Sequence, residues 1–145
     1  MGGPIGRILI RRYNFFAKTL MRRLFGDKHK LSDAAHEHYL RPLAAPEDRT
    51  GCLVFPKQII GSTPWLDRIW ENISTLNGIP KLFVWGMKDM AFREKELRRW
   101  ERTFPEARSI RFTSVGHFVQ EEAPEELAEA VVSFTEKPTL RTKNL

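Results

Sequence analysis

The sequence contains little cysteine and no long apolar run. Its single cysteine, Cys52, excludes an internal disulfide bond, which fits a reducing compartment. No apolar run approaches the roughly 18 residues that a membrane-spanning helix needs, so we do not expect an integral membrane protein. Apolar residues make up 41% of the 145 residues and charged residues 29%, which is the balance of one ordinary globular domain.

Excess positive charge is scarce outside the N-terminal segment. The net charge is +6, but residues 1–30 hold eight Lys and Arg residues and only one acid, Asp27. The remaining residues carry 16 basic and 17 acidic side chains, so the high isoelectric point belongs to the N-terminal segment. No RNA- or DNA-binding motif accompanies this charge, and we therefore expect no nucleic-acid partner.

The basic segment predicts one amphipathic helix over residues 5–25. Its apolar residues recur at spacings of four, three, four and four, which places them on one helical face: Leu9, Tyr13, Phe16, Leu20 and Leu24. We expect this face to pack on another element of a cytoplasmic protein. The alternatives are contact with a membrane surface and a mitochondrial presequence, because the stretch is rich in Arg and poor in acids.

Further helical signals follow this segment. A helix capped by Ser32 is predicted over residues 32–40. Residues 52–55 are predicted to form a short extended run that a proline closes. Another helix is expected to begin at the cap Thr63 and to end before Gly78, which stands where a left-handed residue is common.

The pattern then changes to alternating strands and helices. Residues 81–85 form a short apolar run typical of a strand buried on both faces, a helix ends before Pro105, and residues 109–112 form a second strand. Pro124 opens a last helix, and residues 136–145 are predicted to be a flexible tail. This alternation predicts a parallel α/β sheet. Two strands are fewer than an independent sheet normally needs, so the fold is predicted to be incomplete.

Two polar residues come shortly after the predicted strands. Asp89 follows the first strand and His117 follows the second. Because the carboxyl ends of adjacent parallel strands meet at one edge of a sheet, the Asp89 carboxylate can accept the Nδ1 proton of His117. That bond would fix the tautomer and leave Nε2 free as a general base. The alternative is an ordinary loop aspartate and a loop histidine satisfied by its surroundings.

Three histidines near the N-terminus raise the question of a metal site. They are His29, His36 and His38. The spacing of the last two places them on different sides of a helix. We therefore expect no metal ion, and no cofactor.

Three joined motifs carry a family resemblance. They read "PKLFVWGMKDMAF", "RWERTFPEA" and "VGHFVQEEAPEELAEAVVSF". Together they resemble the C-terminal part of haloalkane dehalogenases and their close relatives. The upstream stretch "LSDAAHEHYLRPLAAPEDRTGCLVFPKQI" is similar to the segment that leaves the cap domain of that family and re-enters the core.

The resemblance implies the C-terminal part of an α/β-hydrolase fold. Residues 1–56 would form a helical cap-like segment, residues 57–135 part of the hydrolase core, and residues 136–145 the tail. Asp89 matches the acid of G-x-x-D that orients the triad histidine, and His117 matches the base of G-H-[FY]-x-x-E. In this family an Asp nucleophile displaces halide to form an alkyl-enzyme ester, which a His-activated water then hydrolyses. The substrate would be small, apolar, and halogenated or ester-like.

The sequence matches the family least well in the residues of the substrate pocket and in the nucleophile. Pro42 and Phe92 match pocket-wall positions of the family. No G-x-S-x-G or G-x-D-x-G elbow occurs in the sequence, so the chain by itself is predicted to be inactive. Four other residues are candidates for the nucleophile, and none of them stands in a turn between a strand and a helix: Asp27, Asp33, Asp48 and Ser62.

Several functions remain open at this point. One is hydrolysis of epoxides, esters or β-lactones by a relative of the haloalkane dehalogenases. Another is a split hydrolase whose nucleophile lies on a second chain. A third is a truncated, inactive product, or a module that binds a partner or a membrane through the basic helix. In each case the incomplete sheet predicts a partner chain or self-association that completes it.

Overall fold

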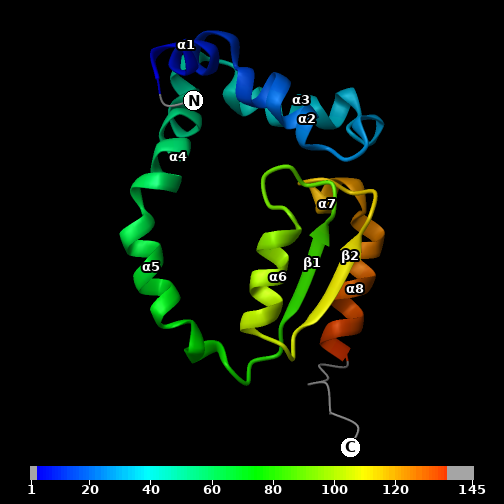
Figure 1. Ribbon diagram of the computed structural model, residues 1–145. Coiled ribbons are helices and arrows are strands. Elements are labelled where there is room, and N and C mark those ends of the chain that lie inside the picture. Colours follow the sequence, from blue (N-terminus) through cyan, green and yellow to red (C-terminus); the bar gives the residue numbers. More distant parts are fainter. Residues whose placement is uncertain (1–2, 137–145) are drawn as a thin grey trace, which may run out of the picture. The chain divides into compact units, whose positions relative to one another are not determined.

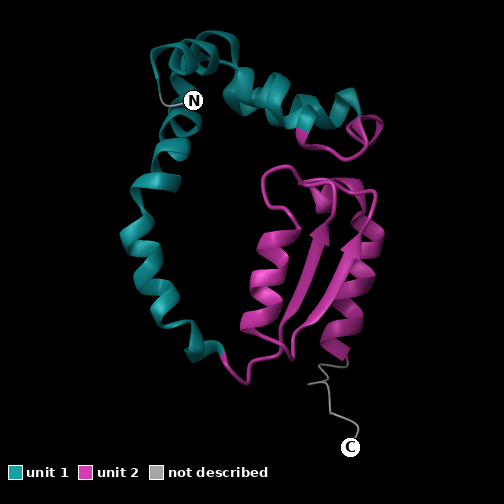
Figure 2. Ribbon diagram, viewed as in Figure 1, with its two compact units in different colours: residues 1–23, 32–76 teal, residues 24–31, 77–145 magenta. Residues whose placement is uncertain are grey.

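The computed structural model describes residues 3–136, which fall into two compact units (Figure 2). Unit 1 contains residues 1–23 and 32–76, and unit 2 contains residues 24–31 and 77–145. Among residues 3–136, no helix combines the length and the apolarity that crossing a bilayer requires. The tail predicted for residues 136–145 lies outside the described residues, except for Glu136 at the end of the last helix.

Unit 1 begins with three short helical segments where the sequence predicted one continuous helix. These are α1 (Pro4–Tyr13), the π-helical turn η1 (Phe16–Leu20) and α2 (Met21–Leu24). The break occurs at Asn14, which adopts left-handed backbone angles and donates its side-chain amide to the carbonyl of Leu43 at 3.0 Å. The prediction of one helix over residues 5–25 was therefore wrong.

The buried face of this segment also differs from the predicted one. Tyr13 is 59% exposed and Leu9 is 37% exposed, although both belong to the predicted stripe. The buried residues lie one position further along: Ile10, Asn14, Ala17 and Met21. This buried face is apolar except for Asn14, which is 2% exposed.

The next helix agrees with its prediction. Helix α3 (Asp33–Leu40) is capped by Ser32, whose hydroxyl accepts the backbone N–H of Ala35 at 3.1 Å. His36 is buried, and its Nδ1 accepts from Arg22 Nε at 2.9 Å while its Nε2 lies 2.8 Å from the carbonyl of Ala17. Both ring nitrogens therefore take part in fixing α3 against the preceding segment.

Two 3₁₀ turns lead into a helix that the sequence did not predict. These turns are η3 (Arg41–Leu43) and η4 (Pro46–Arg49), and helix α4 spans Thr50–Gly61 with a proline inside it. The extended run predicted for residues 52–55 was wrong. Arg49, which is 6% exposed, donates to the carbonyls of Arg11, Leu43 and Ala44 and so holds the chain where α4 begins. The predicted boundary between a cap-like segment and a core segment, at residues 56 and 57, falls inside helix α4. The division of the chain into these two segments stays a prediction.

Unit 1 ends with helix α5 (Thr63–Glu71) and the 3₁₀ turn η5 (Ile73–Leu76). Helix α5 carries a proline in its first turn, as predicted, and its N-cap is Ser62, one residue before the predicted Thr63. Its apolar stripe is exposed to solvent, with Trp65 55% exposed and Ile69 47% exposed. Gly78, the first glycine after it, has a positive φ of 78°, as predicted for a left-handed position.

Unit 2 contains a two-stranded parallel sheet flanked by helices (Figure 1). Strand β1 (Leu82–Gly86) pairs with β2 (Arg108–Phe112) in a register that aligns Val84 with Ile110. Helix α6 (Glu94–Thr103) connects them, and α7 (Val119–Glu122) and α8 (Pro124–Glu136) follow. The parallel pairing confirms the predicted parallel α/β sheet. The sequence did not predict helix α7.

The core of unit 2 lies around α6 and the loops that follow the strands. Leu97 on α6 is 0% exposed, and Phe104 just beyond it is 1% exposed. The Phe104 ring stacks on Trp100 at a centroid distance of 6.3 Å. The residues of β1 from Leu82 to Trp85 are only half-buried, because one strand alone lies beside them among the described residues.

Candidate active site

The first candidate residue, Asp89, lies in the loop after β1 and is held by the backbone of its own loop. Its N–H donates to the carbonyl of Gly86 at 3.1 Å. Its Oδ1 accepts the N–H groups of Ala91 at 2.7 Å and Phe92 at 3.0 Å. The side chain is 9% exposed, so the carboxylate has one orientation and its Oδ2 remains available for another partner.

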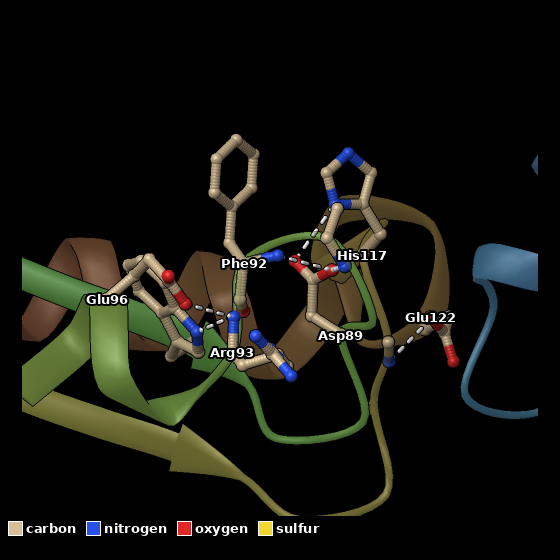
Figure 3. A network of polar contacts seen from close by, with 9 residues as sticks. Asp89, Phe92, Arg93, Glu96, His117 and Glu122 are labelled. Carbon is tan, nitrogen blue, oxygen red and sulfur yellow. Dashed lines mark hydrogen bonds and ion pairs between the residues drawn. The ribbon is translucent and has the colours of Figure 1, made fainter. Parts of the chain in front are cut away.

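That partner is His117, in the loop after β2 (Figure 3). His117 Nδ1 lies 2.9 Å from Asp89 Oδ2. Because an ionised carboxylate can only accept, the proton of this bond belongs to Nδ1, and in the neutral imidazole Nε2 then carries the lone pair. Nε2 makes no hydrogen bond within residues 3–136, and the imidazole is 27% exposed. The structure thus brings together the two residues that the sequence placed at the ends of adjacent strands.

Close backbone contacts explain why the two loops lie side by side. Gly86 ends β1, and a Cβ built on it would lie 2.7 Å from the carbonyl oxygen of Val115 and closer still to that of Gly116. The N–H of Lys88 donates to the same Val115 oxygen at 2.9 Å. A side chain at Gly86 would therefore push the His117 loop away from the Asp89 loop.

Aromatic rings border the imidazole on two sides. The ring of Phe92 stacks beside that of His117, at 5.7 Å between centroids and 21° between planes. The ring of Phe118 meets His117 edge-on at 5.0 Å. Phe92 is 54% exposed, and its carbonyl accepts the indole N–H of Trp85 at 2.8 Å. Pro42 is exposed on η3 in unit 1, and pocket-wall roles for Pro42 and Phe92 stay predictions.

The start of α6 supports the Asp89 loop from its far end. Glu96 Oε2 accepts the backbone N–H of Arg93 at 2.8 Å, and Glu96 Oε1 lies 3.3 Å from Lys95 Nζ. Desolvation raises the pKa of Glu96, but the contacts with Lys95 and the Arg93 N–H lower it more, so the pKa lies below its usual value. The carboxylate caps the first turn of α6 through its bond to the Arg93 N–H.

Sequence reasoning missed one residue of this region, Glu122 on α7. Glu122 is 1% exposed, and its carboxylate accepts three backbone N–H groups. Oε2 accepts from Gly26 at 2.9 Å and from Asp27 at 3.0 Å, and Oε1 accepts from Gly116 at 2.8 Å. The motif G-H-[FY]-x-x-E ends at Glu121, one position before Glu122, and so does not include it. The three donors are backbone N–H groups, which every non-proline residue has, so no signal for this contact stands in the sequence.

Comparison with known proteins shows the family. Residues 5–124 match the model of the alpha/beta hydrolase fold family, and the chain belongs to that family. Haloalkane dehalogenase 2 from Mycobacterium tuberculosis is 38% identical over 136 residues, which cover 91% of this chain and 46% of that protein. Cis-3-alkyl-4-alkyloxetan-2-one decarboxylase from Shewanella oneidensis is 27% identical over 147 residues, which cover 96% of this chain and 45% of that protein.

Solved structures agree on the fold. Haloalkane dehalogenase DbeA from Bradyrhizobium elkanii, in a loop variant, superposes with a TM-score of 0.83 at 19% identity, over 99% of this chain and 49% of that one. Haloalkane dehalogenase DatA from Agrobacterium tumefaciens gives 0.80 at 20% identity, over 94% and 48%. The resemblance to haloalkane dehalogenases predicted from the motifs is confirmed. The chain spans about half the length of the curated relatives it matches.

Proposed function

We propose that this chain supplies the acid and the base of a haloalkane dehalogenase-like hydrolase. The observation that carries the proposal is the bond between His117 Nδ1 and Asp89 Oδ2, formed beyond the ends of two adjacent parallel strands, with Nε2 left free. A carboxylate, an oriented imidazole and an unpaired ring nitrogen make a general base with a fixed tautomer.

The chemistry we propose for these two residues is the one that the resemblance to haloalkane dehalogenases implies. His117 Nε2 takes a proton from water, and the hydroxide attacks the carbonyl carbon of an alkyl-enzyme ester. The bond between that carbon and the alkoxide oxygen breaks, and the alcohol leaves with the proton from Nε2. The nucleophile is left as a carboxylic acid, which releases its proton to water and becomes a carboxylate again. Asp89 stabilises the imidazolium between the two proton transfers at Nε2. No elbow motif for the nucleophile that forms the ester occurs in the sequence, and we propose that a segment outside these 145 residues carries it.

The substrate we propose is a small, apolar, halogenated compound. The rings of Phe92 and Phe118 beside the imidazole provide apolar surface on which such a compound can pack. A halogenated carbon offers a good leaving group and no polar group that needs hydrogen bonding, which suits an apolar wall.

The chain by itself is expected to show no turnover of haloalkanes, epoxides or simple esters. A base and its orienting acid have nothing with which to attack carbon. Halide and proton release from a panel of these compounds would measure this, with the His117→Ala variant as the control. Hydrolysis that disappears in His117→Ala would show that the chain contains a nucleophile after all.

A completed enzyme tests the roles of the two residues directly. It can be made by joining this chain to the part of the Mycobacterium tuberculosis relative that the chain does not match. In that enzyme His117→Gln should accumulate the alkyl-enzyme ester, visible as a mass increase, and Asp89→Asn should lower turnover by about 10⁴-fold. The matched control is Asp67→Asn, an exposed aspartate on α5. Near-full activity of Asp89→Asn would mean that another acid orients the histidine.

A second candidate substrate is a β-lactone. The relative from Shewanella oneidensis is named for an oxetan-2-one, which is a four-membered lactone ring. The same acid and base would serve such a substrate, so the completed enzyme should be offered haloalkanes and β-lactones in parallel. Release of carbon dioxide without halide turnover would favour the lactone.

We further propose that a partner chain or a second copy completes the sheet along β1. Arg108 N–H donates to the carbonyl of Lys81, and Met87 N–H donates to that of Phe112, so odd-numbered residues of this run direct their backbone groups toward β2. The backbone groups of Leu82 and Val84 therefore point to the opposite edge. An open edge of this kind is a template for another strand.

A further inference from the structure

The carboxylate of Glu122 joins two segments that lie far apart in the sequence. It accepts from the N–H groups of Gly26 and Asp27, more than 90 positions upstream, and from that of Gly116, next to His117. Lys30 Nζ donates to the backbone carbonyl of Glu122 itself. All of these residues belong to unit 2. The three bonds to the carboxylate are charge-assisted, and such bonds are shorter and stronger than those between neutral groups.

The backbone of His117 itself also bonds to the segment that contains Gly26. The backbone N–H of His117 donates to the carbonyl of Leu24 at 2.9 Å. A Cβ built on Gly26 would lie 2.7 Å from Gly116 N, so the two backbones are in direct contact. Phe25 and Phe118 pack beside this contact, with ring centroids 5.1 Å apart. The backbone from which the imidazole projects is thus held from both sides, and Glu122 is the acceptor common to both.

We propose that Glu122 is a positioning residue for His117. It holds the Gly116 N–H against the segment that contains Gly26, and this sets the backbone position from which Nδ1 reaches Asp89 Oδ2. Figure 3 shows Glu122 bonded to the backbone beside His117, while the His117 ring is bonded to Asp89. The catalytic value of this positioning rests on the proposed function, but the effect on the His117–Asp89 bond does not.

The chemistry of the site predicts what a glutamine would do at position 122. Three N–H donors surround the carboxylate, and both of its oxygens accept. A carboxamide has one accepting oxygen, and its NH₂ group can only donate. Glutamine can satisfy the two donors of Gly26 and Asp27, but its NH₂ group then faces the N–H of Gly116. The bond nearest His117 is therefore the one expected to break.

The test is nitrogen NMR of the histidine rings in the full 145-residue chain. In the unmodified chain, His117 should show a single tautomer protonated at Nδ1, with that proton protected from exchange by Asp89. In Glu122→Gln the protected proton signal should be lost, and both tautomers of His117 should appear. Glu129→Gln on the exposed side of α8 is the matched control, and Asp89→Asn is the reference for complete loss.

His36 provides an internal standard within the same spectra. Its two ring nitrogens are bonded within unit 1, so its signals should not move in any of these variants. Loss of order confined to His117 supports positioning. A His117 signature in Glu122→Gln identical to that of the unmodified chain overturns the proposal.

Folding of the variants is checked by the amide signals of β1 and β2. If Glu122→Gln loses them, Glu122→Asp decides the matter, because it keeps the charge but is one methylene too short to reach both sides. The same mixture of tautomers in a folded Glu122→Asp chain supports the proposal, and an unchanged His117 overturns it. Unfolding of both variants also overturns it, since Glu122 would then be a determinant of folding.

The outcome also separates this inference from the proposed function. If His117 shows both tautomers in the unmodified chain, the bond to Asp89 is absent in solution, and both proposals are overturned. A single tautomer that survives in Glu122→Gln overturns the positioning role alone.

Discussion

Replacing Gly86 with alanine should separate the loops that carry Asp89 and His117. The added methyl group would meet the carbonyl oxygens of Val115 and Gly116, with the first at 2.7 Å. Both are backbone atoms, so no side-chain rotation relieves the clash, and the loop after β2 must move. Gly86 does not have a positive φ, so the effect is steric and not conformational.

The size of the effect can be worked out from the contacts that the movement breaks. Overpacking in a well-packed interior costs about 1–3 kcal/mol. Moving the loop also weakens the bonds from Lys88 N–H to Val115 O, at 2.9 Å, and from Met87 N–H to Phe112 O, at 3.0 Å. Each bond contributes about 0.5–1.5 kcal/mol, and some of that loss overlaps with the overpacking. We expect unit 2 to lose about 2–4 kcal/mol of stability in total.

Hydrogen exchange of the β1 and β2 amides is the assay that isolates this unit. A loss of about 2–4 kcal/mol should speed their exchange by about 30- to 700-fold, since each 1.4 kcal/mol is a factor of ten. The matched control is Gly51→Ala on α4, where a Cβ would meet nothing within 4 Å. Because alanine is the better helix former, this variant should stabilise α4 by about 0.5–1 kcal/mol and leave the strand amides unchanged.

Two results would refute this reasoning. Strand exchange in Gly86→Ala within a factor of about two of the unmodified chain, equivalent to less than about 0.5 kcal/mol, would mean that the loops have room for a methyl group. A comparable acceleration in Gly51→Ala would mean that the assay reports on the whole chain and not on this contact.

Two further predictions concern the core and the open edge of unit 2. Leu97→Ala should destabilise unit 2 by about 2–5 kcal/mol in urea unfolding, because Leu97 is 0% exposed. Val132→Ala, at a side chain that is 54% exposed, should change the stability by less than about 0.5 kcal/mol, and equal losses in the two variants would contradict the assigned core. The free edge of β1 at Leu82 and Val84 predicts self-association or dependence on a partner chain, measurable by sedimentation at low concentration. A monodisperse monomer with one sharp unfolding transition would rule that out.

The positions of the two candidate catalytic residues could be predicted from the sequence because they depend on local signals. A short apolar run bounded by a proline and a glycine marked the first strand, and the run at residues 109–112 marked the second. Parallel strands bring their carboxyl ends to the same edge. Asp89 and His117 each follow one such run, so their contact required only that the two strands be neighbours. The cap at Ser32 was predictable for a similar reason, since its hydroxyl bonds to the N–H of Ala35, three residues away.

Interactions between distant residues decided the features that the sequence left ambiguous or hidden. The apolar residues 52–55 suit a strand or a helix equally, and in the structure they belong to α4. This helix begins directly after Arg49, whose buried guanidinium is bonded to three carbonyls. Asn14 interrupts the N-terminal helix because its amide reaches Leu43, 29 residues away. Glu122 accepts N–H groups from Gly26 and Asp27. Every non-proline residue has such a backbone donor, so only the folded chain determines which ones meet a buried carboxylate.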